Sequence, residues 1–152
     1  MDSDPISREP RALIVEDESL IAEELRERLS RLGFSVIAAV DSAEEGIAIA
    51  TSERPDLVLM DIRLKGEKDG VQAAKEIRQQ VDVPIVYVTA YSDQLTVDRA
   101  KESDHDGYIL KPFHASELQS TIDVAMQRHA IRARQETTTG GDPDAVPTST
   151  NK

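Results

Sequence analysis

Four short apolar runs of the sequence each end at polar side chains that could do chemistry. The run A-L-I-V ends at Glu16 and Asp17, and the run L-V-L-M ends at Asp61. Thr89 and Lys111 close or follow two later runs. Carboxylates can bind a metal ion or attack phosphorus, while hydroxyl and ammonium groups can hold phosphate oxygens. If the runs are parallel strands, their carboxyl ends bring these side chains to one edge of a sheet.

Each of these residues, taken alone, also has an ordinary structural explanation. Acids that follow a strand often cap a helix, Thr is common in strands, and Lys usually lies on the surface. Asp61 is harder to explain in this way, because an acid that closes a buried run loses its hydration unless something pairs with it. The occurrence of such residues at four strand ends together favours a functional site.

The acids Glu16, Asp17 and Asp61 would repel one another at one edge of a sheet without a cation. Mg²⁺ suits them because it prefers oxygen ligands and combines one or two carboxylates with phosphate oxygens. Lys111 can then pair with one phosphoryl oxygen, and Thr89 can donate a hydrogen bond to another. Asp61 would be the nucleophile that forms an aspartyl phosphate.

The segments that position these residues alternate between two periodicities. Runs rich in Val, Ile and Leu, typical of buried parallel strands, occupy residues 12–15, 35–40, 57–60, 83–89 and 108–110. The longer segments between and after them repeat apolar residues at helical spacing. Five strands alternating with five helices predict an α/β fold: a doubly wound, five-stranded parallel sheet of order 2-1-3-4-5, in three layers.

Several residues predict where helices begin and end. Gly33 follows the apolar stripe of the first helix and ends it. Ser42, with Glu45 three residues later, predicts a capping box at the start of the second helix. The fourth helix, Asp93–Glu102, has few apolar anchors and is expected to be the least firmly packed element.

Length and charge limit the class of protein. The chain has 152 residues and a net charge of −11, from 18 Lys and Arg against 29 Asp and Glu. This length fits one domain, and this charge disfavours binding to nucleic acid or to acidic membranes. The chain has no Cys, no secretory signal pattern and no long apolar stretch, so we expect a soluble cytoplasmic protein. Residues 1–10 and 135–152 are predicted to be disordered around a domain over 11–134.

Four strings of the sequence together resemble the receiver domain of two-component response regulators. They are A-L-I-V-E-D-E, L-V-L-M-D-I, P-I-V-Y-V-T-A and G-Y-I-L-K-P-F. The match runs from about Arg11 to about His129, with the signature positions in the family's order. The resemblance implies the flavodoxin-like receiver fold and a phosphoacceptor role in a phosphorelay.

The resemblance also implies a role for each site residue. Asp61 would accept a phosphoryl group from the phosphohistidine of a sensor histidine kinase or phosphotransfer protein. Asp17, Asp61 and the backbone carbonyl of Arg63 would bind Mg²⁺, with Glu16 acting directly or through water.

Three further positions follow from the same resemblance. Thr89 and Lys111 would hold the phosphoryl oxygens, and the small Ala90 would leave room for them. Tyr108 would be an aromatic switch that turns inward when Thr89 moves toward the phosphate. The peptide bond before Pro112 is usually cis in this family.

The sequence departs from the commonest receiver pattern after Asp61. It reads D-I-R-L-K-G-E-K-D-G, one residue longer than usual and without the usual Pro. This form resembles a subgroup found beside sensor-type or antitermination modules, so the departure bears on partner choice and loop mobility. The loop S-D-H-D-G before the fifth strand is also more acidic than usual.

The chain after the resemblance is too short for a DNA-binding effector, so we expect a stand-alone receiver without separate enzymatic turnover. Phosphorylation of Asp61 would switch a protein-binding face made by the fourth helix, fifth strand and fifth helix. A downstream protein would bind there, and a phosphorylation-dependent homodimer is also compatible with such a switch.

Three other interpretations compete with a phosphorylated receiver. A phosphatase of the haloacid-dehalogenase type would carry a second Asp two residues after the nucleophile, but that position is Arg63. A scaffold that binds without phosphorylation would not need the acids, Thr89 and Lys111 together. Metal binding by histidine is disfavoured because the histidines have no i, i+4 spacing: His105, His114 and His129.

Overall fold

One parallel sheet forms the centre of the molecule. The computed structural model describes residues 9–90 and 106–141. The five strands are β1 (Arg11–Val15), β2 (Ser35–Val40), β3 (Leu57–Asp61), β4 (Ile85–Ala90) and β5 (Gly107–Lys111). They are hydrogen-bonded in the order β2-β1-β3-β4-β5. The predicted fold class and strand order are confirmed, and each strand lies within two residues of its predicted bounds.

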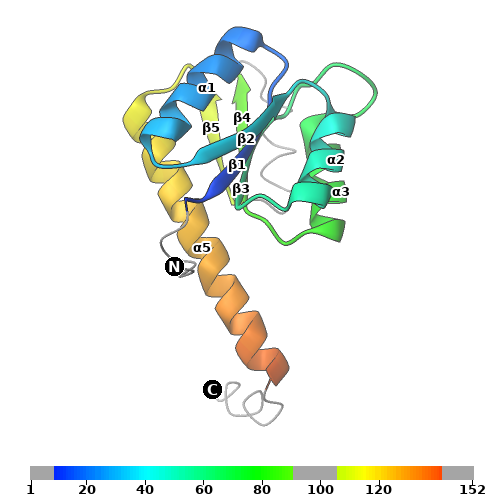
Figure 1. Cartoon of the computed structure of the whole chain (residues 1–152), viewed down its shortest axis with the longest axis vertical. Coiled ribbons are helices and arrows are strands. Elements are labelled where there is room, and N and C mark those ends of the chain that lie inside the picture. Colours follow the sequence, from blue (N-terminus) through cyan, green and yellow to red (C-terminus); the bar gives the residue numbers. More distant parts are fainter. Residues whose placement is uncertain (1–8, 91–105, 142–152) are drawn as a thin grey trace.

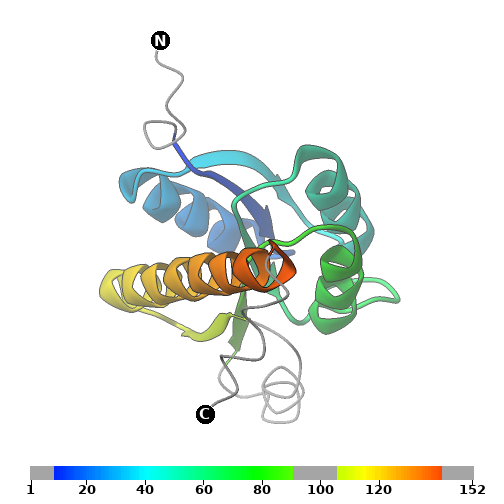
Figure 2. The same ribbon diagram turned by 90° about the horizontal axis from the view of Figure 1, so that it is seen from below.

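Helices cover both faces of the sheet, as the three-layer prediction requires. They are α1 (Ser19–Arg31), α2 (Ala43–Glu53), α3 (Gly70–Gln80) and α5 (Ala115–Gly141). Figures 1 and 2 show α1 and α5 on one face and α2 and α3 on the other. The predicted fourth helix, 93–102, lies outside the described residues.

The alternation of side chains along each strand divides the core into two parts. In β3, which is buried along its whole length, Val58 and Met60 pack with the α2 and α3 side. Leu57 and Leu59 pack with the α1 and α5 side. Successive strand residues point to opposite faces, so a central strand must be apolar on both. This is why the strand runs are continuous rather than alternating.

Local signals fix where the helices begin and end. The Ser42 hydroxyl accepts a hydrogen bond from the Glu45 N–H at 3.2 Å, which confirms Ser42 as the N-cap of α2. The Glu45 carboxylate accepts from the Ser42 hydroxyl at 3.4 Å and not from the Ser42 N–H, so the cap is not the full capping box that was predicted. Gly33 follows α1 with φ of 95°, a conformation that favours glycine. At the start of α3, Asp69 and Gln72 form a reciprocal capping box, which is not among the features predicted from the sequence.

Described segments reach beyond the expected bounds of the domain, 11–134, at both ends. The Pro10 carbonyl accepts a hydrogen bond from the Ser35 N–H at 2.8 Å, which extends the pairing of β1 with β2 by one step. At the other end, α5 continues through Gly141, although the sequence predicts disorder from residue 135. Adding a residue to an existing helix costs far less than starting one, and Gln135 and Glu136 are good helix formers.

No described helix is apolar enough over sufficient length to cross a membrane. Although α5 has 27 residues, charged and polar side chains interrupt it throughout.

Candidate functional site

The strand register brings the predicted site residues to the carboxyl edge of the sheet. Val15 is the Cα partner of Met60, so Glu16 follows β1 beside Asp61 at the end of β3. Asp61 is in turn the partner of Val88 on β4. Farther along the edge, β4 and β5 pair through their last residues.

The three acids form a compact group at this edge. Glu16, Asp17 and Asp61 each offer a carboxylate oxygen, and these oxygens lie within 4.8 Å of one another. Glu16 and Asp61 are only 3% and 5% exposed. Hard oxygen donors at this spacing have the chemistry of a site for a divalent cation such as Mg²⁺.

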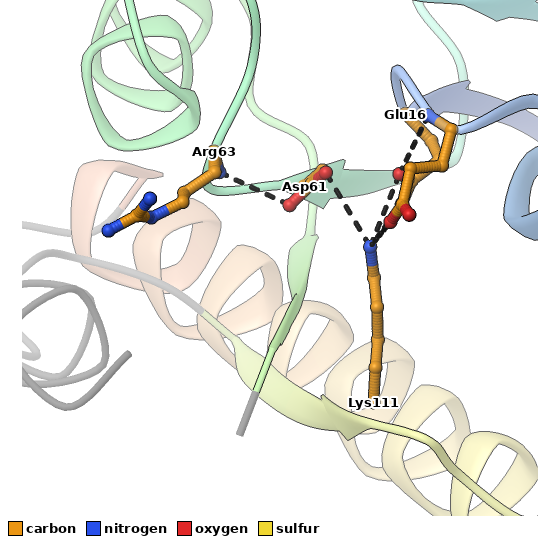
Figure 3. A network of polar contacts seen from close by, with 5 residues as sticks. Glu16, Asp61, Arg63 and Lys111 are labelled. Atoms are coloured by element: carbon orange, nitrogen blue, oxygen red, sulfur yellow. Dashed lines mark hydrogen bonds and ion pairs between the residues drawn. The ribbon is translucent and has the colours of Figure 1, made fainter. Parts of the chain in front are cut away.

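A lysine from the neighbouring strand neutralises part of this charge. The Lys111 Nζ lies 3.1 Å from Glu16 Oε1, 3.1 Å from Glu18 Oε1 and 3.6 Å from Asp61 Oδ2. Figure 3 shows its side chain crossing from β5 toward Glu16 and Asp61. Burial acts to lower the pKa of Lys111, but the charges of Asp61, Glu16 and Glu18 outweigh it and raise the pKa. The ammonium therefore stays charged.

The surroundings of Asp61 favour its protonated form. Burial and the negative charge of Glu16 raise the pKa of Asp61 to about 8. The Lys111 ammonium and the Arg63 N–H act in the opposite direction; this N–H donates to Asp61 Oδ1 at 3.1 Å. A divalent cation beside the carboxylate would stabilise the ionised form, which is the nucleophilic form. The acid group thus fits a metal ion electrostatically as well as geometrically.

The start of α3 lies in close contact with the turn that carries Asp61. The Gly70 N–H donates to the Ile62 carbonyl at 2.7 Å. A Cβ atom on Gly70 would lie 2.1 Å from the Asp61 carbonyl oxygen and 2.8 Å from the Ile62 Cα. Only glycine fits such a close approach. Gly70 is not among the site residues predicted from the sequence, although the D-G pair that ends the loop is a signal for it.

Thr89 supplies a hydroxyl at the same edge. It is 1% exposed, and its Oγ1 has no hydrogen-bond partner among the described residues. An unsatisfied buried hydroxyl costs free energy. A phosphoryl oxygen bound at the edge would be a suitable acceptor for it.

Comparison with known proteins places this geometry in a family. The model of the response regulator receiver domain matches residues 12–123, well over half of the chain. The chain belongs to the response regulator receiver family. The resemblance drawn from the four sequence strings is confirmed.

A curated relative is longer than this chain. The transcriptional regulatory protein PdtaR of Mycobacterium tuberculosis strain H37Rv is 37% identical over 118 residues. The match covers 78% of this chain and 57% of PdtaR. The chain thus spans little more than half the length of that relative.

Solved receivers share both fold and sequence with the chain. The receiver domain of a modulated diguanylate cyclase from Desulfovibrio desulfuricans G20 has a TM-score of 0.76 and 37% identity; the match covers 82% of this chain and 99% of that one. The receiver domain of the sensor histidine kinase PA1611 from Pseudomonas aeruginosa PAO1 has a TM-score of 0.71 and 30% identity, covering 79% and 99%. The latter was solved with a magnesium ion in its active site cleft.

Two other expected receiver features are present in the structure. The Lys111–Pro112 peptide bond is cis. Tyr108 lies on β5 opposite Tyr87 of β4 and is half-buried against the α2 and α3 side of the core. This receiver therefore holds the aromatic side chain on the strand that also supplies Lys111.

Neither of the two described histidines takes part in the acid group. The His114 N–H donates to Glu117 Oε1 at 2.8 Å at the start of α5. The His129 Nε2 lies 3.0 Å from Asp82 Oδ1. His105 is outside the described residues. Within residues 9–90 and 106–134, the group able to hold a metal is the acidic one.

Proposed function

We propose that Asp61 accepts a phosphoryl group from the phosphohistidine of a sensor histidine kinase or phosphotransfer protein. A carboxylate oxygen of Asp61 attacks phosphorus, the phosphorus–nitrogen bond breaks, and the imidazole nitrogen keeps the electron pair. The observation that carries this proposal is the burial of Asp61 between two further acids and the Lys111 ammonium.

Asp17, Asp61 and the backbone carbonyl of Arg63 would hold Mg²⁺, with Glu16 acting directly or through water. The ion, when bound, would neutralise charge on the phosphoryl group. The close group of acid oxygens supports these assignments.

Lys111 and Thr89 would hold the phosphoryl oxygens. Lys111 is well suited because its ammonium already lies within 4 Å of Asp61. The unsatisfied Thr89 hydroxyl supports the second assignment. Preorganised donors of this kind provide most of the catalysis in phosphoryl transfer.

The output of the chain would be a protein contact rather than DNA binding or separate enzymatic turnover. We place it on the face made by the fourth helix, β5 and α5, with Tyr108 as the aromatic switch; a phosphorylation-dependent homodimer would use the same face. A groove of about 500 Å³ on the described part of this face supports the location, and it is lined by Tyr108, Ile109, Leu110, Pro112, Glu117, Ser120 and Thr121.

We place the protein in the cytoplasm. Its lack of Cys fits that reducing compartment.

Incubation with acetyl phosphate and Mg²⁺, followed by intact mass measurement, tests the phosphoacceptor role. We expect the full chain to gain one phosphate and Asp61→Asn to gain none. Equal labelling of the two proteins would overturn the proposal. Rapid turnover of p-nitrophenyl phosphate without accumulation of the phosphorylated chain would instead indicate a phosphatase.

A further inference from the structure

Glu18 occupies the N-cap position of α1 without capping the helix. Its backbone is extended, with φ of −96° and ψ of 112°, and its side chain makes no capping hydrogen bond. Ser, Thr, Asp and Asn are favoured at such positions because their short side chains accept hydrogen bonds from the first helical N–H groups. The Glu18 side chain therefore does not serve the helix in the usual way.

The backbone of Glu18 is instead tied to the acid group. Its N–H donates to Glu16 Oε2 at 3.1 Å. Its carboxylate then extends to Lys111, where Oε1 lies 3.1 Å from Nζ. Glu18 thus contacts one acid and the lysine of the proposed phosphoryl site.

Glu18 holds Lys111 closely although it is exposed to solvent. The Lys111 ammonium is as near to Glu18 as to the buried Glu16, at 3.1 Å, and is farther from Asp61, at 3.6 Å. The Glu18 side chain is 64% exposed, whereas that of Lys111 is 13% exposed. Two of the three carboxylates around the ammonium therefore lie nearer to it than the proposed phosphoacceptor does.

We propose that Glu18 is a positioning residue that competes with the phosphoryl group for Lys111 and thereby slows phosphorylation of Asp61. This inference rests on the proposed function of Asp61. An ammonium has three N–H donors, and here Glu16 and Glu18 both accept from it. A phosphoryl group on Asp61 gains the full charge of Lys111 only when the contact with Glu18 is weakened.

The negative charge of Glu18 alone could also slow phosphorylation, by repelling an anionic donor. Glu18→Asp separates the two effects, because it keeps the charge but shortens the side chain by one methylene. An aspartate at this N-cap also accepts hydrogen bonds from the helix backbone, which turns it away from Lys111. Competition for Lys111 therefore predicts that Glu18→Asp behaves like Glu18→Gln, whereas charge repulsion predicts that it behaves like the unchanged chain.

The test is the initial rate of phosphorylation by acetyl phosphate at fixed Mg²⁺, followed by intact mass. Exposed ion pairs are weak, so we expect Glu18→Gln and Glu18→Asp to be faster by roughly two- to fivefold. Glu27→Gln is the matched control, because Glu27 is also 64% exposed on α1 and pairs with Arg31 at 3.0 Å; we expect its rate to equal that of the full chain. Thermal unfolding shows whether each variant is folded, and Glu18→Asp should raise the melting temperature.

Ionic strength provides a second readout that a structural role would not change. Salt screens exposed pairs, so the ratio of the Glu18→Gln rate to that of the full chain should fall toward one as salt increases. An unchanged or slower rate of phosphorylation in Glu18→Gln would overturn the inference. A rate in Glu18→Asp equal to that of the full chain would also overturn it. If the full chain is labelled no more than Asp61→Asn, the proposed function itself fails.

Discussion

As the proposed phosphoacceptor, Asp61 must satisfy two demands that conflict in a buried side chain. A carboxylate attacks phosphorus only when ionised, yet burial beside Glu16 raises the pKa of Asp61 to about 8. In the folded protein without a cation, Asp61 therefore carries a proton over much of the neutral range. The free energy of unfolding therefore falls as the pH rises from the ordinary pKa of Asp61 to about 8, because over this range the unfolded chain has lost the proton that the folded protein keeps. Binding of a cation compensates for this cost.

The first prediction concerns the pH dependence of Mg²⁺ binding. Below about pH 8 one proton must leave Asp61 as the ion binds, so affinity should rise with pH, by up to roughly tenfold per unit, and level off above about pH 8. Isothermal titration calorimetry over pH 6 to 9 measures this. Asp61→Asn should bind more weakly and with little pH dependence, and equal affinity of the full chain at pH 6 and pH 8 would contradict the prediction.

The second prediction concerns the contact of Gly70 with the acceptor turn. A methyl group at Gly70 would meet the Asp61 backbone at 2.1 Å, whereas one at Gly46 would meet the Val15 side chain at 2.8 Å. Backbone moves less readily than a side chain, so Gly70→Ala should lose about 3 kcal/mol of unfolding free energy or more, and Gly46→Ala less. Urea unfolding gives both values.

The rate of phosphorylation distinguishes a general loss of stability in Gly70→Ala from a local displacement of Asp61. Gly70→Ala should also be phosphorylated more slowly by acetyl phosphate, because the displaced residue is Asp61 itself. Gly46→Ala should keep the rate of the full chain. Equal effects of the two variants on the rate would show that the close contact does not position the acceptor.

At the scale of elements, one buried acid joins the start of β5 to three neighbours. Asp106 Oδ2 accepts from the Ile85 N–H of β4 at 3.0 Å and from Arg78 of α3 at 2.7 Å. Its Oδ1 lies 2.8 Å from the Arg132 Nη2 of α5. Burial acts to raise the pKa of Asp106, but these hydrogen bonds and charges outweigh it and lower the pKa. Asp106 therefore fastens α5 to the edge of the sheet opposite the acid group.

The third prediction is that Asp106→Asn destabilises the fold by about 3 kcal/mol near neutral pH, because it leaves Arg78 without its buried counter-charge. A carboxylate with a lowered pKa stabilises the fold above its ordinary pKa and loses this effect as the pH falls through the folded value. The difference between Asp106→Asn and the full chain should thus shrink below about pH 4.

Urea unfolding at several pH values measures the effect of Asp106. Asp82→Asn is the control, because Asp82 is 66% exposed and pairs with His129 of α5, the helix that also carries Arg132. It should cost under about 1 kcal/mol. A similar cost for both variants would show that the buried network contributes no more than a surface pair.

The sequence was informative about elements because the two periodicities are distinct. Continuous apolar runs predicted buried strands such as β3, and the order of the runs predicted which carboxyl ends meet. Glu16, Asp17 and Asp61 could therefore be grouped before any geometry was known. The Gly70 contact and the Asp106 network could not be predicted from the sequence, because both depend on distances between segments far apart in the chain.

The end of α5 shows a different limit of prediction. Thr and Gly residues from Thr137 onward lower intrinsic helix propensity, so the sequence favoured an unstructured segment. In the structure the helix continues from the packed turns around Ile122 and Ala125. Propagation from an anchored helix outweighs weak local propensity.

At the scale of the whole molecule, β5 connects the acid group with α5. Lys111 at its carboxyl end contacts Glu16 and Asp61, and Asp106 precedes its other end and holds Arg132. Tyr108 lies on the strand between them. Figure 1 shows α5 continuing past the sheet, away from the acid edge. A displacement of Lys111 toward a phosphoryl group therefore acts on the strand that anchors the long helix.

The fourth prediction is that beryllofluoride with Mg²⁺, a mimic of the phosphoryl group, changes amide exchange in β5 and the first turns of α5. To move the population of a two-state face from 1:99 to 99:1, the mimic must favour one state by about 5.5 kcal/mol. Because a tenfold change in rate corresponds to about 1.4 kcal/mol, amide exchange rates on this face should change by tenfold or more. Amides of β1 and of the core-facing side of α3 should change much less.

Asp61→Asn should show no response, and Thr89→Ala should bind the mimic yet respond weakly. Equal protection of β5 and α5 with and without the mimic would mean that the acid edge is not coupled to this face.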